Sequence, residues 1–239
     1  MKIFFIILFP ILLLSCTDER PYPWISELDS EKEFEESGKN LMAVKMGLNP
    51  LEIKTGKETK ILIVVHGSNS RGYEWIYPIK TMDDEDTLTM FNRWDDADCP
   101  NPSFLLLNNS IEKLTKENSN IEKIIIMGHS YGGLLVSMFS ERWQFNTPVE
   151  IHSIASPLAG ISNLNLKCNY EKPNFISSNV KFFEWRTQQS LDNAFKDLET
   201  DPQLITLEGS VVRRLPGLYK GRRLGHNWSI SWVADELKP

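Results

Sequence analysis

IIIMGHSYGG, residues 124–133, joins an apolar run to a serine that is flanked by glycines. Its central part, GHSYG (128–132), matches the pattern G-x-S-x-G, with a predicted buried strand before it and a predicted core helix after it. A sharp strand-to-helix turn crowds the serine backbone, and neighbours without Cβ relieve that crowding. Such a turn would raise the hydroxyl of Ser130 above the sheet, so we interpret Ser130 as a nucleophile rather than as part of a plain turn.

Predicted strands and helices alternate on both sides of this stretch. The strongest strands are continuous β-branched runs such as KILIVVHG, residues 60–67. The alternation predicts an α/β fold with a mostly parallel central sheet, helices on both faces, and functional groups at the carboxyl ends of the strands. The expected strands are 60–67, 87–94, 121–128, 149–155, 180–186 and 203–209, and the expected helices are 102–117, 132–143 and 226–237.

The composition is that of an ordinary globular protein. Of 239 residues, 41% are hydrophobic and 24% are charged, and the net charge is −6. This mild negative charge gives no reason to expect a nucleic-acid partner. The acidic stretch 83–86 is interpreted as a solvated loop, because no ligand spacing typical of a calcium loop surrounds it.

The first sixteen residues, MKIFFIILFPILLLSC, are typical of an export signal. One lysine precedes an uncharged apolar run, residues 3–14, that is short for a membrane span. The end of this segment resembles the lipobox of bacterial lipoproteins, although Leu14 departs from the usual residue; an ordinary secretory signal is the alternative. The resemblance implies lipidation of Cys16 and a membrane-anchored protein, and Thr17 favours the outer membrane. The expected organisation is a signal peptide (1–15), a polar tether (16–40) and a single domain (41–239).

Most of residues 58–239 resembles an α/β-hydrolase of the lipase and esterase kind. The resemblance rests on the GHSYG turn and on His66-Gly67 at the end of an expected strand. It implies an oxyanion hole formed by the backbone N–H groups of Tyr131 and Ser68, with Asn69 as the alternative to Ser68. The residues expected to support the turn and this loop are His66, Gly67, Gly128 and Gly132.

The family's triad follows the chain order serine, acid, histidine. His226 lies after the last expected strand and is the predicted base, whereas His152, inside an apolar strand, is predicted to be structural. The acid should follow the strand at 180–186, and the preferred candidate is Asp192, with Asp197 and Asp201 as alternatives.

These residues imply a serine hydrolase that cleaves acyl esters, lipids among them, through an acyl-enzyme, with no metal or cofactor. A thioesterase or amidase would use the same triad. A catalytically silent fold that serves as a binding module of the envelope is the alternative of another class.

Three further features surround the predicted site. Cys99 and Cys168 lie in loops expected at the same edge of the sheet, so we hypothesise a disulfide between them. The long segment 157–179 has no clear helical pattern and is expected to form a lid or pocket wall. The basic segment 213–223 just before His226 is expected to be a solvated turn or a contact for anionic groups.

Overall fold

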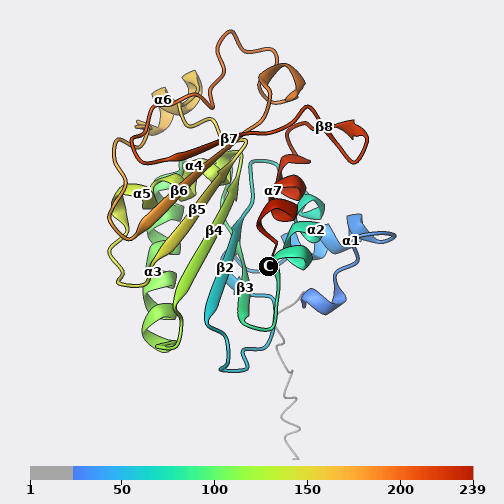
Figure 1. Cartoon of the computed structure of the whole chain (residues 1–239), viewed down its shortest axis with the longest axis vertical. Coiled ribbons are helices and arrows are strands. Elements are labelled where there is room, and N and C mark those ends of the chain that lie inside the picture. The colour runs from blue at the N-terminus through green and yellow to red at the C-terminus, as the bar shows by residue number, and fades with distance from the viewer. Residues whose placement is uncertain (1–23, 239) are drawn as a thin grey trace, which may run out of the picture.

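The computed structural model describes residues 24–238, without the side chains of Ser162 and Asn163. A seven-stranded sheet runs through the molecule in the order β1-β3-β2-β4-β5-β6-β7 (Figure 1). Within this sheet of the described residues, only the pairing of β1 with β3 is antiparallel, so the predicted α/β fold with a mostly parallel sheet is confirmed. The strands are β1 (Gly47–Pro50), β2 (Lys60–Val65), β3 (Thr87–Arg93), β4 (Lys123–His129), β5 (Val149–Ile154), β6 (Val180–Arg186) and β7 (Val211–Arg214).

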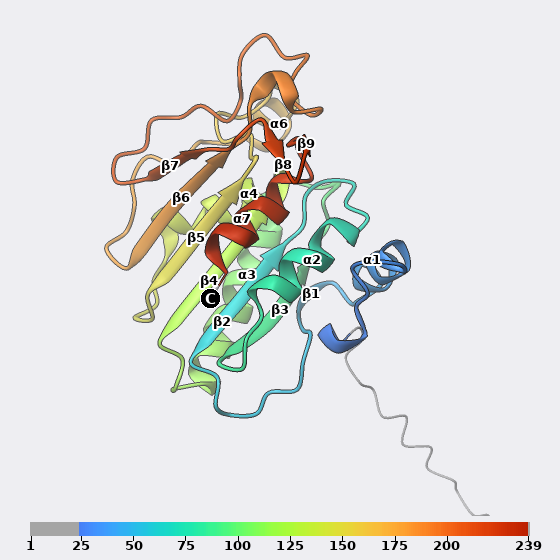
Figure 2. The ribbon, with the colours of Figure 1, turned by 45° about the vertical axis from the view of Figure 1, so that its right-hand side comes forward.

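Helices cover both faces of the sheet (Figures 1 and 2). Side chains alternate across a strand, so Ile61, Ile63 and Val65 of β2 join one buried cluster, while Leu62 and Val64 join the other. Burying each of these aliphatic side chains stabilises the folded state by about 1.5–3 kcal/mol relative to leaving it exposed to water. One face carries α3 (Pro100–Glu117), α4 (Tyr131–Ser137) and α5 (Phe139–Arg142), and the other carries α1 (Phe34–Met42), α2 (Tyr73–Met82) and α7 (Ser229–Leu237).

The strand order places two loops side by side at the carboxyl end of the sheet. The chain leaves β2 toward β3 on one side and returns to β4 on the other. The strand order therefore reverses at β2, and the loops on its two sides diverge. Ligands of open α/β sheets bind in the crevice between such loops. The loop after β2 begins at His66 and the turn after β4 contains Ser130.

The described chain begins with ordered structure in the region expected to be a tether. A short 3-10 helix, η1 (Ile25–Glu27), precedes α1. Leu28, which follows η1, and Leu41 of α1 are almost completely buried, and α1 packs against α2. The expected signal peptide and Cys16 lie outside the described residues. Within residues 24–238, no helix has the length and apolar character that crossing a membrane requires.

Three predicted elements differ from the structure. Residues 203–209 form no strand, since Gln203 turns its side chain back to Thr187, and the last sheet strand is β7. The core helix expected at 132–143 is divided at Met138 into α4 and α5. The segment 157–179 contains the helix α6 (Ser162–Cys168), whose pattern was too short to stand out.

Candidate active site

The backbone of Ser130 is strained at the turn between β4 and α4. Its φ of 53° and ψ of −119° lie where residues with a side chain are rarely found. Such a conformation costs about 1–3 kcal/mol and persists only where the surroundings hold it. Here Ser130 N–H donates to Ile154 O at 2.8 Å, and the Ser156 hydroxyl donates to Ser130 O at 2.8 Å. The carboxyl end of β5 therefore holds both sides of the turn.

The glycines of the turn are required by close packing of the backbone. A Cβ on Gly128 would lie 2.4 Å from Gly132 O, and a Cβ on Gly132 would lie 2.3 Å from His66 O. Both distances are far shorter than a carbon–oxygen contact allows. Gly128 thus lets α4 start directly above β4, and Gly132 lets α4 touch the end of β2, as the sequence pattern predicted for supporting residues.

The loop after β2 lies against the turn. A Cβ on Gly67 would lie 3.0 Å from Ser130 Cβ, so no larger residue fits there without movement. The His66 Nδ1–H donates to Gly67 O at 2.8 Å. The C=O and N–H of one trans peptide point in opposite directions, so this bond turns the Ser68 N–H away from His66.

Arg93 and Trp94, at the end of β3, fix the tautomer of His66. His66 Nε2 lies 3.0 Å from Arg93 Nη1 and accepts the Trp94 N–H at 3.3 Å. Burial, above all, lowers the pKa of His66 to about 4, so the ring is neutral at pH 7. The neutral ring can donate through Nδ1 and accept through Nε2 at the same time. Sequence reasoning missed both partners, although they stand at the end of a strand.

The two candidate donors of the oxyanion loop differ in their partners. The Asn69 N–H donates to Asp96 Oδ2 at 2.6 Å and is therefore occupied. The Ser68 N–H has no acceptor among residues 24–238. Tyr131 is the first residue of α4, where a backbone N–H has no acceptor within the helix. The geometry favours Ser68 over Asn69 as the partner of Tyr131.

Asp192 and His226 are joined by a hydrogen bond. His226 Nδ1 lies 3.0 Å from Asp192 Oδ2. Asp192 follows η2 (Gln189–Leu191) and is fully buried, and its Oδ1 accepts the Ala194 N–H at 2.8 Å. Asp197 is exposed, whereas Asp201 lies 3.8 Å from Arg214 and does not contact His226. Of the three predicted candidates, the structure brings only Asp192 to the histidine.

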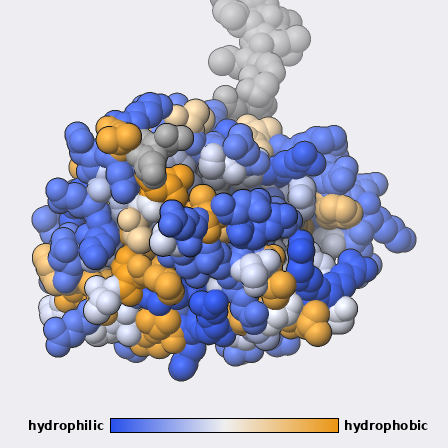
Figure 3. All heavy atoms as spheres, turned by 90° about the horizontal axis from the view of Figure 1, so that it is seen from above, coloured by the Kyte–Doolittle hydropathy of each residue, from blue (hydrophilic) through white to orange (hydrophobic). Residues whose placement is uncertain are grey.

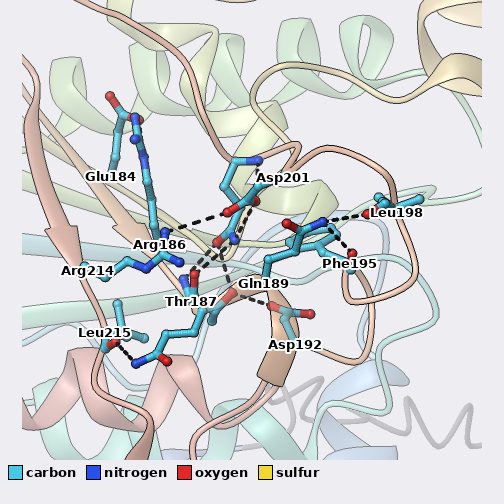
Figure 4. A network of polar contacts seen from close by, with 12 residues as sticks. Glu184, Arg186, Thr187, Gln189, Asp192, Phe195, Leu198, Asp201, Arg214 and Leu215 are labelled. Atoms are coloured by element: carbon cyan, nitrogen blue, oxygen red, sulfur yellow. Dashed lines mark hydrogen bonds and ion pairs between the residues drawn. The ribbon is translucent and has the colours of Figure 1, made fainter.

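A polar network holds the carboxylate of Asp192 in place (Figure 4). The Thr187 hydroxyl donates to Asp192 Oδ2 at 2.5 Å, and the Thr187 N–H donates to Gln203 Oε1 at 2.9 Å. The Gln203 side-chain amide in turn donates to Thr187 O at 3.2 Å. Sequence reasoning missed this pair; the only signal was that Thr187 is the first residue after β6.

His226 is packed next to the turn that carries Ser130. The rings of His129 and His226 are 4.6 Å apart, and His129 Nε2 lies 3.2 Å from His226 O. Burial, and then the neighbouring His226, keep the pKa of His129 well below its usual value, so His129 is a neutral donor here. The ring centres of Phe195 and His226 are 5.1 Å apart, and the two rings are nearly perpendicular. These contacts fix the histidine between the turn and the Asp192 loop.

The remaining histidine lies away from this group. His152, in β5, is buried, accepts the Trp185 indole N–H at 3.0 Å and stacks on Phe183. Its burial lowers its pKa to about 3. The structure thus agrees with the prediction that His152 is structural.

A disulfide joins two loops at the carboxyl end of the sheet. Cys99 and Cys168 are bonded, as hypothesised, across 69 residues of chain. Cys168 is the last residue of α6, and the loop of Cys99 also contacts the turn, because the Tyr131 hydroxyl donates to Asp98 O at 2.9 Å. The bond therefore fastens α6 beside α4.

Comparisons with known proteins place the fold. No protein-family model matches this sequence, and a search of curated proteins finds no significant match. Similar solved structures include a presumed thioesterase from Silicibacter sp. (13% identity, TM-score 0.55, covering 93% of this chain and 91% of that one). An a/b serine hydrolase without lid from Xanthomonas campestris matches at 13% identity and TM-score 0.53, covering 80% and 86%. Est1E from Butyrivibrio proteoclasticus matches at 12% identity and TM-score 0.50, covering 80% and 91%. The chain has the α/β-hydrolase fold.

Proposed function

We propose that this protein is a serine hydrolase that cleaves carboxylic esters, with Ser130 as nucleophile, His226 as base and Asp192 as acid. The observation that carries the proposal is the Asp192–His226 hydrogen bond beside a strained serine at a helix N-terminus. An acid, an imidazole and a serine in this arrangement are recognised by geometry and not by sequence position. Ser130 Oγ has no hydrogen bond within the described residues, and such catalytic contacts often tighten only when substrate binds.

The reaction follows from the residues around Ser130. The hydroxyl attacks the acyl carbonyl while His226 takes its proton, and the Asp192 carboxylate stabilises the imidazolium. The N–H groups of Tyr131 and Ser68 donate to the oxyanion that forms. His226 then protonates the leaving alcohol, and water repeats the sequence to release the acid and restore Ser130.

A fluorophosphonate probe tests the proposal. The purified protein should be labelled at Ser130, Ser130→Ala should lose the label, and Ser110→Ala in α3 should keep it. The same three proteins should show hydrolysis of short acyl esters that only Ser130→Ala abolishes. Wild-type protein that takes up no label and cleaves no ester would support the silent binding module instead. A panel of thioesters and amides of equal acyl length then ranks the leaving groups.

We also propose export and attachment to a membrane through a lipidated Cys16. The proposal rests on the apolar run 3–14 and its lipobox-like end. The Cys99–Cys168 disulfide supports export, since such bonds persist in oxidising compartments. Metabolic labelling with a fatty acid should mark the wild type and spare Cys16→Ala; equal labelling of both would contradict lipidation of Cys16.

A further inference from the structure

We propose that the ester substrate carries a negatively charged group on its alcohol portion, and that Arg222 and Arg223 bind this group beside His226. The inference rests on the proposed function and adds a substrate class to it. The two arginines form β9 (Arg222–Arg223), which pairs with β8 (Leu218–Tyr219) in a hairpin just before the histidine.

A surface hollow of about 540 Å³ connects the arginines to the histidine. It is open to solvent and none of its lining residues has a carboxylate. The residues that line it include Asn193, Arg222, Arg223, His226, Asn227 and Trp228. All six can donate hydrogen bonds, so the hollow is suited to an anion.

The hairpin that presents the arginines is held by the body of the protein. Its two-residue turn has left-handed backbone at Lys220 (φ 49°) and Gly221 (φ 74°), as a tight hairpin turn requires. The Tyr219 hydroxyl donates to Asp235 of α7 at 2.5 Å, and the Leu224 N–H donates to Gly217 O at 2.9 Å. The arginines thus project from a braced support rather than from a free loop.

Each guanidinium is also oriented by a neighbour that leaves its charge uncompensated. Arg222 lies 5.7 Å from the Trp228 ring centre, and Arg223 Nη2 donates to Asn193 Oδ1 at 3.1 Å. Within residues 24–238, neither arginine lies within ion-pair distance of a carboxylate.

Lys220 and Arg214 differ from Arg222 and Arg223 in this respect. Lys220 lies 3.3 Å from Asp235, and Arg214 lies 3.8 Å from Asp201. Among residues 24–238, Arg222 and Arg223 therefore line one hollow without a carboxylate partner, in a chain whose net charge is −6. A planar guanidinium can bind a carboxylate or phosphate through two parallel hydrogen bonds.

The position beside His226 decides which part of the substrate is bound. His226 gives its proton to the leaving oxygen, so the alcohol portion departs from the side of the imidazole. The end of the molecule on which the strands finish shows a largely hydrophilic surface with separate apolar patches (Figure 3). This surface suits a soluble anionic substrate better than a continuous lipid surface.

Esters that differ only in charge test the inference. 4-Acetoxybenzoate and 4-acetoxyphenyl phosphate carry an anion on the alcohol side, 4-acetoxybenzamide is neutral, and monophenyl succinate carries its anion on the acyl side. The readout is the ratio of kcat/KM for each anionic ester to that for the neutral one. In the Arg222→Gln/Arg223→Gln double variant, the ratio for alcohol-side anions should fall about tenfold, and high salt should lower the wild-type ratio. Arg213→Gln removes an exposed arginine of β7 outside the hollow and should keep the ratio.

Three results would overturn the inference: equal loss of the ratio in Arg213→Gln, no change in the double variant, or a change for monophenyl succinate alone. Comparing the ester that carries a carboxylate with the ester that carries a phosphate shows which anion is preferred. Preference for either anion over the neutral ester supports the subsite. Circular dichroism and thermal melting confirm that each variant is folded.

Binding measurements separate the subsite from the catalytic proposal. Ser130→Ala should bind 4-hydroxybenzoate more tightly than 4-hydroxybenzamide by calorimetry, and adding the two arginine substitutions should remove the difference. That result supports the subsite even if no ester is cleaved. Cleavage of esters without any such difference would overturn the subsite and leave the hydrolase intact. Sedimentation with anionic and neutral vesicles completes the test. If the two arginines matter only for binding to anionic vesicles, they contact a lipid surface, and the substrate subsite is overturned.

Discussion

The two halves of the site are built in different ways. Around Ser130, backbone atoms of β4, α4 and the loop after β2 are packed so closely that Gly128 and Gly132 accept no Cβ. Around His226, side chains form the structure: Thr187 holds Asp192, and Asp192 holds the imidazole. The first half depends on the absence of side chains, and the second depends on particular ones.

The difference shows which changes each half should tolerate. In the backbone half, added volume is damaging because the contacts are between main-chain atoms that cannot move independently. In the side-chain half, a change that keeps volume but removes a hydrogen bond is damaging, because a buried charged group loses a partner. The predictions below test this contrast, beginning with the largest effect.

Asp192→Asn should lower kcat for ester hydrolysis about 10⁴-fold while the protein stays folded. The amide keeps the shape of the buried acid but no longer stabilises a protonated His226 or selects the tautomer with hydrogen on Nδ1. Steady-state kinetics and circular dichroism measure the two effects. Asp197→Asn is the matched control, since Asp197 is exposed, and a similar loss there would contradict the assignment.

Gly132→Ala should lower the free energy of unfolding by about 3 kcal/mol, because its Cβ would lie 2.3 Å from His66 O. Urea unfolding measures the change. The control is Gly221→Asn in the hairpin turn. A Cβ added at Gly221 would meet no atom within 4 Å, and asparagine tolerates positive φ. Equal stability of the two variants would show that the backbone half is less tightly packed than its geometry indicates.

Thr187→Val should lower kcat about tenfold and the free energy of unfolding by about 2 kcal/mol. Valine keeps the volume but removes the hydroxyl that donates to Asp192 Oδ2. Thr187→Ser retains that donor and should recover most of the activity. A serine variant as impaired as the valine variant would mean that packing, and not the hydrogen bond, is what Thr187 supplies.

His66→Gln and His152→Gln should each make stability less dependent on pH. Burial lowers the pKa of the two histidines to about 4 and about 3, below the ordinary 6.5 of an unfolded chain. The unfolded chain therefore binds protons first, so the free energy of unfolding falls as the pH falls below 6.5, by up to about 1.4 kcal/mol per pH unit for each histidine. Each substitution should remove one such contribution between about pH 6 and pH 4.

Activity at pH 7.5 separates the two histidines. His66 bonds to Gly67 O in the loop that carries the proposed oxyanion donor Ser68, so His66→Gln should lower kcat, whereas His152→Gln should leave it within twofold of wild type. In the stability measurements, burial raises the pKa of Glu52 to about 7, so this residue makes the free energy of unfolding depend on pH with the opposite sign in every variant. Only differences in stability between variants are therefore compared. Equal kcat in both variants would remove His66 from the backbone half of the site.

The fold class and the glycine-flanked serine turn were accessible from the sequence because their signals are local. A buried strand, a glycine-flanked serine and an apolar helix lie within one run, residues 124–143, and the strand before His66 has the same character. His226 was the predicted base because few histidines exist and the family's triad has a set chain order; that role stays a prediction. Asp192 was preferred among three candidates, and its contact with His226 distinguishes it in the structure.

Other features depend on which loops meet at the carboxyl end of the sheet. The bond from Thr187 to Gln203, the bond from Arg93 to His66 and the occupation of the Asn69 N–H by Asp96 each join residues 16 to 27 positions apart through side chains. No periodic pattern encodes such contacts. The segment 203–209 was predicted as a strand and is rich in aliphatic residues, yet the side chain of Gln203 holds its start in a loop.

The sequence by itself determined that a serine stands at a sharp turn after a buried strand in an α/β fold, because crowding at that turn demands glycine locally. Only the tertiary structure decided which carboxylate meets His226 and which N–H of the loop after β2 has no acceptor among residues 24–238. It also decided that Arg222 and Arg223, without a carboxylate partner among those residues, line one hollow with the histidine. These are properties of side chains brought together from distant loops, and they exist only when the sheet has aligned those loops at one edge.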